Sequence, residues 1–385
     1  MRTRRTSIVI ILAAMAALAL VGGTWALSGT ARPNVLPGQV VAADVTSGAK
    51  LSGAAQLGAA SYPPGLQDLP GEITRFALDP SDDALWFATI TPTGQNALYR
   101  YDPKTATSAS FTLPADPGGG LFVGIAASAD ALWVGWDQTL VRFDKAAKAT
   151  QRFAIPAPAR PLPGEGKWIR DLALTSDGRV WLTVQHAASM FAFDPASHAF
   201  TEQELTGFGA ADRIALGTNG VLWLTLARDS ATAQEFTKIA LFNPTSGTTR
   251  VIAEKASSIA ADRDGSVLLG GNPNGITRIS TAGSVVERFA GSHPALATDI
   301  ILALGQGHVA TNDRRANAID TFDPSTRSWT RHQLTTKVGT IAPPQGYTGP
   351  TQQEIVNEIT DMHVDSTGAI WAVDPSYRRF VKITP

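Results

Sequence analysis

Beyond residue 70, short apolar runs alternate with polar turns, and this alternation recurs as a unit along the chain. Each unit has an apolar strand, a turn with Asp, Asn, Ser or Gly, an apolar strand with Trp, a variable loop and an aromatic-Asp-Pro triplet. This pattern is typical of short antiparallel strands joined by tight turns. The Trp position occurs seven times, with an aliphatic residue in two copies: Trp86, Trp133, Trp181, Trp223, Leu268, Val309 and Trp371.

The spacing of these seven positions indicates the size of the repeating unit. Five of the six intervals lie between 41 and 48 residues, which is the length of a four-stranded propeller blade. The last interval is 62 residues and contains an insertion at 335–357, which we interpret either as a lid over part of the upper face or as a flexible surface loop. Blades with two apolar faces are best buried by closing into a ring. The sequence therefore predicts an all-β fold, a seven-bladed β-propeller of four-stranded antiparallel blades over residues 72–385.

The seventh blade is one strand short, because the chain ends where the third strand of that blade should finish. A strand from before Gly71 is therefore expected to pair with the last strand, around Phe380 to Ile383, and to close the ring. The segment 39–45 is our candidate for this closing strand.

The first 31 residues indicate export. Three arginines, Arg2, Arg4 and Arg5, precede an uncharged stretch whose core, 8–21, is almost wholly apolar. About 20 such residues suffice for an N-terminal hydrophobic helix that crosses a membrane, and the arginines favour a cytoplasmic N-terminus. The segment is either a transmembrane anchor or a cleaved signal peptide, so the propeller is membrane-anchored outside the cytoplasm, or secreted. Residues 32–71 are rich in Ala, Gly, Pro and Ser, which predicts a linker.

Composition excludes several kinds of chemistry and partner. The chain has no cysteine, so disulfides, thiolate metal sites and cysteine nucleophiles are absent. The formal net charge is −1, which gives no general attraction to nucleic acid, and nucleic acid is not expected as a partner. We expect a monomer that binds a protein, a peptide or a cell-envelope ligand.

Propeller topology brings distant polar residues to one face. The loops after each Trp strand and the connections between blades emerge together around the channel mouth, where the inner strands also begin. Counting six residues back from each turn places Asp171, Arg213, Ser258 and Asp361 at equivalent positions on inner strands. Such convergence favours a binding site. The candidate ligand-binding residues are Arg170, Asp171, His186, Arg213, Asp229, Asn312, Arg314, Asp361, Tyr377 and Arg378.

Two other interpretations of these residues remain open. Arg170-Asp171 and Asp212-Arg213 would also form a ring of ion pairs that neutralises charge near the channel. The repeated Trp side chains are expected to fill the space between blades rather than to bind a ligand. No His-Glu-x-x-His or Gly-x-Ser-x-Gly motif occurs, so we assign no catalytic residue, no metal ligand and no cofactor.

The repeat Asp/Asn-Gly-x-Leu/Val-Trp-Leu-Thr, together with the segment 274–280, resembles that of the virginiamycin B lyase (streptogramin lyase) group over residues 72–385. The resemblance implies a seven-bladed propeller and, for the lyases of that group, a magnesium-assisted ring opening by His and Glu on one face. Repeats of the group often carry Glu after Trp-Phe-Thr, whereas Val184 and Leu226 stand at these positions here.

Two classes of function follow. The first is a membrane-tethered scaffold that binds a ligand or protein with its loops, and the sequence favours it. The alternative is a streptogramin lyase-like or lactonase-like enzyme at the channel mouth, with Mg²⁺ as cofactor if the lyase chemistry holds.

Overall fold

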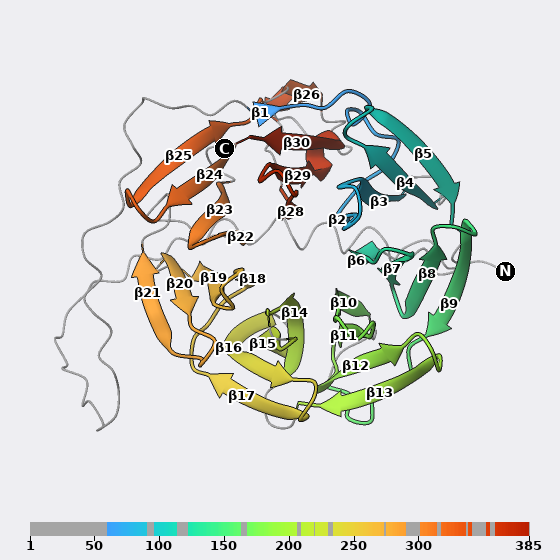
Figure 1. Cartoon of the computed structure of the whole chain (residues 1–385), viewed down its shortest axis with the longest axis vertical. Helices are drawn as coiled ribbons and strands as arrows, with labels where there is room; N and C mark the ends of the chain where they lie inside the picture. Colours follow the sequence, from blue (N-terminus) through green and yellow to red (C-terminus); the bar gives the residue numbers. More distant parts are fainter. Residues whose placement is uncertain are drawn as a thin grey trace, which may run out of the picture. The chain divides into compact units, whose positions relative to one another are not determined.

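The computed structural model describes residues 60–384, with gaps at 91–95, 114–121, 163–167, 206–208, 219, 230–233, 273–274, 290–300, 314–316, 336–337, 341–351 and 355–358. Within the described residues, seven four-stranded sheets are arranged around a central channel (Figure 1). In blades 1 to 6 the strands follow one another from the channel outwards, and every pairing is antiparallel. The predicted seven-bladed β-propeller is therefore confirmed.

Short apolar strands build each blade, and tight turns join them. The strands of blades 1 to 3 are β2 (Phe76–Leu78), β3 (Leu85–Ile90), β4 (Asn96–Asp102), β5 (Thr107–Thr112), β6 (Phe122–Ala127), β7 (Ala131–Trp136), β8 (Thr139–Asp144), β9 (Ala149–Ala154), β10 (Ile169–Leu174), β11 (Val180–Val184), β12 (Ser189–Asp194) and β13 (Ala199–Glu204). Those of blades 4 to 6 are β14 (Ala210–Leu216), β15 (Leu222–Asp229), β16 (Gln234–Asn243), β17 (Thr248–Ile252), β18 (Ser258–Ala261), β19 (Val267–Asn272), β20 (Gly275–Ile279), β21 (Val285–Phe289), β22 (Ile301–Gly305), β23 (His308–Asp313), β24 (Ala318–Asp323) and β25 (Ser328–Gln333).

The core lies between neighbouring blades, as predicted for the repeated Trp position. Trp86 of blade 1 stacks on Phe111 and packs against Phe143 of blade 2, and it is only 2% exposed. Trp181 of blade 3 likewise packs against Phe242 of blade 4. All seven residues at the repeat position are buried, so each fills an interface between two sheets and holds adjacent blades at a fixed angle.

Blade 7 combines the two ends of the described chain. Its strands β28 (Asp361–Val364), β29 (Ile370–Asp374) and β30 (Arg379–Ile383) are followed at the rim by β1 (Ala60–Ser61). Ala60 pairs with Ile383 and Ser61 with Lys382, so a strand from before Gly71 does close the ring. The candidate segment 39–45 was the wrong choice for this position, which β1 occupies; that segment lies outside the described residues.

Apolar residues after β1 complete the closure. Leu66 and Leu69 are buried in the cluster that contains Phe76, Trp371 and Phe380. The Leu69 amide donates to the Arg378 carbonyl at 3.0 Å, and the Phe380 amide donates to the Leu66 carbonyl at 3.1 Å. Residues 60–69 therefore belong to blade 7 in structure, although their composition is that of a linker.

One arginine connects the pieces of this closure. The Arg379 guanidinium lies 4.2 Å from the ring of Tyr377 and 4.5 Å from that of Tyr62, and it forms an ion pair with Asp374 at 3.2 Å. It also donates to the Thr335 carbonyl at 2.7 Å, while the Thr335 amide donates to the Tyr62 hydroxyl at 2.7 Å. We call these five residues the closure clamp; Tyr377 belongs to the 3-10 helix η2 (Pro375–Tyr377).

Two sequence predictions fall on segments that the structure describes only in part or not at all. The insertion 335–357 contains a small antiparallel pair, β26 (Val338–Thr340) with β27 (Gln352–Glu354). Its segment 341–351 is outside the described residues, so the lid stays a prediction.

The expected hydrophobic helix of residues 1–31 also lies outside the described residues. In the described part of the chain, no helix has the length and apolar character needed to span a bilayer.

Candidate functional site

The inner strands present one equivalent position per blade to the channel. In every blade this position lies two residues before the inner-strand residue that pairs with the repeat Trp position. In blade 3, for example, Ala173 pairs with Trp181, and Asp171 precedes Ala173 by two. We call the seven positions the upper ring: Arg75, Gly124, Asp171, Arg213, Ser258, Ile301 and Asp361.

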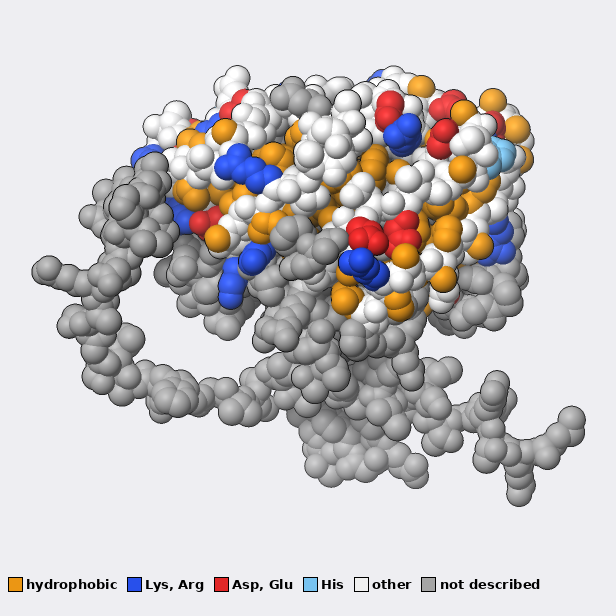
Figure 2. Space-filling view, turned by 90° about the horizontal axis from the view of Figure 1, so that it is seen from below, with side chains coloured by type: hydrophobic (Ala, Val, Ile, Leu, Met, Phe, Trp, Pro, Cys, Tyr) orange, Lys and Arg blue, Asp and Glu red, His pale blue; other side chains and the backbone are white. Residues whose placement is uncertain are grey.

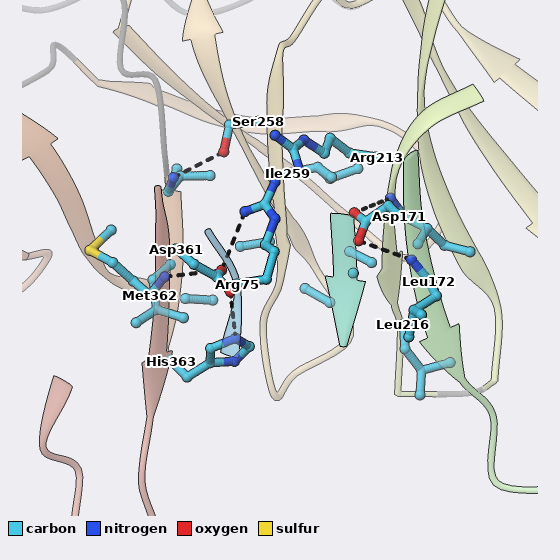
Figure 3. Close-up of a pocket in the computed structure, with 18 of the residues that line it drawn as sticks. Arg75, Asp171, Leu172, Arg213, Leu216, Ser258, Ile259, Asp361, Met362 and His363 are labelled. Atoms are coloured by element: carbon cyan, nitrogen blue, oxygen red, sulfur yellow. Dashed lines mark hydrogen bonds and ion pairs between the residues drawn. The ribbon is translucent and has the colours of Figure 1, made fainter. Parts of the chain in front are cut away.

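All seven residues of the upper ring line one cavity of about 350 Å³ at the centre of the propeller. In Figure 3, Arg75 extends between Asp361 on one wall and Asp171 on the opposite wall, and Arg213 lies beside Ser258. The sequence prediction thus placed Asp171, Arg213, Ser258 and Asp361 together correctly. Their convergence is a consequence of the blade repeat, because every blade contributes its inner strand in the same register.

Three polar residues of the upper ring each connect their own inner strand to that of the next blade. Asp171 accepts from the Ile214 amide at 3.2 Å, Ser258 from the Ile301 amide at 3.0 Å, and Asp361 from the Phe76 amide at 3.2 Å. Inner strands of different blades do not pair with one another, so these amides need a side-chain acceptor. Part of the polar character of the ring is therefore structural.

Blades 1 and 7 form a charged group on one wall of the cavity. Arg75 lies 3.6 Å from Asp361 and donates to the Thr360 carbonyl at 2.6 Å. The second Asp361 oxygen lies 3.3 Å from Nε2 of His363, whose ring packs edge-on against Phe76. Burial opposes ionisation of both groups, yet the carboxylate raises the pKa of His363, and His363 and Arg75 hold the pKa of Asp361 below its ordinary value. The wall thus favours an ionised Asp361.

Asp171 on the opposite wall behaves differently. Burial raises its pKa to about 7, against the opposing effects of the Arg75 charge and of the Ile214 and Leu172 amides, and the Asp361 charge raises it further. Asp171 therefore changes its protonation state near neutral pH, which gives the cavity an acidic group that is neutral or charged depending on pH.

We expect Asp171→Asn to change how stability depends on pH. An unfolded Asp titrates near pH 4, whereas folded Asp171 keeps its proton up to about pH 7, so ionisation of this group lowers the free energy of unfolding as pH rises between these values. Relative to the parent, the variant should gain roughly 2 to 3 kcal/mol between pH 5 and pH 8. Urea denaturation at both pH values measures it, with the non-titrating Ser258→Ala as control. A parent and variant with the same pH dependence would contradict the shift.

Blade 4 supplies the second arginine of the cavity. Buried Asp212 accepts from Nε of Arg170 at 2.8 Å, so one ion pair of the kind considered in the alternative interpretation is present, and Asp212 lies 3.7 Å from Nε of Arg213. Asp212 is thus shared by two cations and held more closely by Arg170. Among the described residues, the Arg213 guanidinium has no other hydrogen-bonding or ionic partner.

A second layer of side chains lies below the upper ring. The partners of the repeat Trp positions on the inner strands are six alanines and one histidine: Ala77, Ala126, Ala173, Ala215, Ala260, Ala303 and His363. We call this set the alanine ring. Ala215, Ala260, Ala303 and His363 line the cavity together with the upper ring. Small side chains at these positions keep the space below the charged groups open and apolar.

The remaining candidate residues lie away from the cavity lining. His186 is half-buried in the turn between β11 and β12, and its carbonyl accepts from the Leu162 amide at 2.7 Å. Asn312 is buried on β23, and Asp229 ends β15, where it pairs with Gln234. Arg314 lies outside the described residues.

Tyr377 and Arg378 differ from each other although they are adjacent. The Tyr377 ring is buried in the closure clamp, so it serves ring closure rather than the cavity. Arg378 is exposed, with a left-handed φ of 49°. Neither residue is part of the cavity lining.

Two charged or titratable residues of the cavity lining were not predicted from the sequence, Arg75 and His363. The observed strand register places both: Arg75 lies two residues before the partner of Trp86, and His363 is the partner of Trp371. For metals, the described residues contain no group of three or more His, Asp or Glu side chains arranged to hold an ion.

The fold is a seven-bladed β-propeller similar to that of virginiamycin B lyase. A streptogramin B lyase structure aligns over 84% of this chain and 97% of its own, with 15% identity and a TM-score of 0.64. A catalytically inactive histidine-to-alanine variant of virginiamycin B lyase from Staphylococcus aureus with quinupristin aligns over 85% of this chain and 99% of its own (15% identity, TM-score 0.63).

Propellers with other names are similar to nearly the same degree. YCF48 bound to D1 peptide aligns over 88% of this chain and 98% of its own, with 10% identity and a TM-score of 0.61. No protein-family model matches the sequence, and no curated protein matches it. At these identities the likeness shows the fold alone.

Proposed function

We propose that this protein is an extracytoplasmic β-propeller, tethered to the membrane by residues 1–31, that binds a ligand or protein at its central cavity. The observation that carries the proposal is the upper ring. Five of its seven positions hold polar or charged residues, and these residues come from five different blades. A rigid cavity with a few convergent polar groups is the usual form of a binding site.

The surface and the similar structures agree with a binding role. On the side shown in Figure 2, the Lys and Arg side chains of the described residues stand singly or beside Asp and Glu and do not form a broad basic patch. Among the similar propellers, YCF48 is described as bound to a peptide. A propeller of this kind therefore suits recognition of a protein, a peptide or a cell-envelope ligand.

The test is capture from cell-envelope extracts by the full chain. Arg213→Met keeps the aliphatic stem of the side chain but removes its donors, so it should reduce capture of the specific partner at least fivefold. Arg378→Met is the matched control, since Arg378 is exposed and is not part of the cavity lining. Equal capture by all three proteins would refute the cavity as the binding site. Removing residues 1–31 should release the propeller from the membrane fraction.

A second candidate is an enzyme of the streptogramin lyase or lactonase kind. It is favoured by Asp361 and His363 facing Asp171, because a histidine with a carboxylate partner and an acid that titrates near pH 7 are suited to proton transfer. Incubating the full chain with quinupristin and Mg²⁺ tests it by mass spectrometry. If the compound stays intact, or if His363→Gln opens it as fast as the parent, this candidate is rejected.

A further inference from the structure

The hydrogen-bonding capacity left in the cavity is mainly that of donors. Asp361 already accepts from Met362, Phe76 and His363, and Asp171 accepts from Leu172 and Ile214. The Arg213 guanidinium, in contrast, makes only the 3.7 Å contact with Asp212 among the described residues. A ligand that supplies acceptors and negative charge therefore complements the cavity better than a cation does.

The charges of the walls point the same way. On blades 3 and 4, Arg170 and Arg213 share the single carboxylate of Asp212, which leaves one positive charge in excess. On blades 1 and 7, Arg75 is balanced by Asp361. With Asp171 neutral, the cavity carries a net positive charge next to Arg213, and a planar carboxylate matches the forked donors of a guanidinium.

The alanine ring defines the other part of the ligand. Ala215, Ala260 and Ala303 line the cavity directly below the level of Arg213 and Ser258, and their small side chains leave apolar space there. A volume of about 350 Å³ corresponds to roughly a dozen water molecules. That is enough for a carboxylate with a short aliphatic group and too little for a large ring compound held entirely inside.

We propose that the cavity binds a carboxylate attached to a short apolar group, with the carboxylate on Arg213 and the apolar group inside the alanine ring. This inference rests on the proposed binding function and names its ligand class. The chemistry is shared by two sources, the free C-terminus of a peptide with an apolar last residue and a small free carboxylic acid, and the experiment distinguishes them.

Binding of this ligand is coupled to a proton on Asp171. The charged groups around Asp171 are Arg75 of blade 1, Arg170 of blade 3, Asp212 and Arg213 of blade 4, and Asp361 and His363 of blade 7. Because ionised Asp171 repels a carboxylate and protonated Asp171 does not, affinity decreases as pH rises through about 7. Uptake of one proton predicts roughly a tenfold loss of affinity between pH 6 and pH 8.

Calorimetric titration of the full chain tests the proposal with three probes: N-acetyl-Ala-Leu with a free carboxylate, the same dipeptide as its C-terminal amide, and 3-methylbutanoate. The amide should bind at least tenfold more weakly than the acid, a comparison that needs no variant. Arg213→Met should weaken binding of the acid at least tenfold, and Arg378→Met should leave it unchanged. Asp171→Asn should bind with little dependence on pH.

Each outcome decides the proposal. Preference for the acid over the amide together with sensitivity to Arg213→Met supports it, and the tighter of the dipeptide and 3-methylbutanoate identifies the source. Equal binding of acid and amide, or an unchanged affinity in a folded Arg213→Met variant, overturns it. If no carboxylate binds while capture from envelope extracts still depends on Arg213, the ligand class is wrong and the binding function stands; if neither depends on Arg213, both fail.

Discussion

A chain that begins at Gly71 is expected to be less stable than one that begins at Arg32 by more than about 5 kcal/mol, or not to fold. The shorter chain lacks β1, Tyr62 and the buried Leu66 and Leu69 of blade 7. Loss of a buried leucine side chain alone costs about 2 to 5 kcal/mol. It also exposes the edge of β30, whose amides and carbonyls then lack partners.

Thermal and urea denaturation of the two chains measure this effect. If the shorter chain does not fold, Leu66→Ala in the longer chain provides a milder test, with an expected loss of about 2 to 5 kcal/mol. Ser61→Ala is the matched control, because Ser61 is exposed and loses only a hydrogen bond to the Lys382 carbonyl. Equal melting temperatures for the chains beginning at Arg32 and Gly71 would show that residues 60–69 do not close the ring.

Replacing Arg379 by Met is expected to cost about 3 to 5 kcal/mol, although the new side chain is of similar length. Arg379 and Asp374 are 2% and 0% exposed, so the variant leaves a buried carboxylate without its cation. The stacking of the guanidinium on Tyr62 and Tyr377 and its hydrogen bond to the Thr335 carbonyl are lost as well.

The neighbouring arginine provides the control for this experiment. Arg378 is exposed, so Arg378→Met should change the free energy of unfolding by less than about 0.5 kcal/mol. Combining Arg379→Met with Asp374→Asn should restore part of the loss, because the amide carries no charge. Urea denaturation of the parent, the single variants Arg379→Met and Asp374→Asn and the double variant gives the coupling energy, and a coupling near zero would mean that the ion pair does not stabilise the closure.

The fold was predictable because the Trp strand and its hairpin turn recur at nearly constant spacing. Trp181 and Trp223 occupy equivalent buried positions, and their turns carry Gly178 and Gly220 with positive φ. The closing strand was not predictable, because Ala60–Ser61 is only two residues long and has no alternation of apolar and polar positions. Its place depends on long-range contacts of Tyr62, Leu66 and Leu69 instead.

The polar residues of the upper ring were predictable on four blades and missed on a fifth for a local reason. The turn of blade 1 is one residue longer than that of blade 3 and places Asp83, with φ 63°, where blade 3 has Gly178. Counting back from a turn therefore failed to find Arg75. His363 was missed because the count selects one position per strand. His363 lies two residues after the selected position Asp361, where the six other blades have alanine.

The strands of blade 7 come from both ends of the described chain, and this sets the order in which the blades form during synthesis. Residues 60–69 leave the ribosome early, but their partners at 379–383 follow more than 300 residues later. At about 5 to 20 residues per second, this delay is roughly 15 to 60 s. Blades 1 to 6 can pair their own strands during that time, so the last blade is completed only when synthesis is nearly finished, and an early-made segment must stay unpaired and accessible until then.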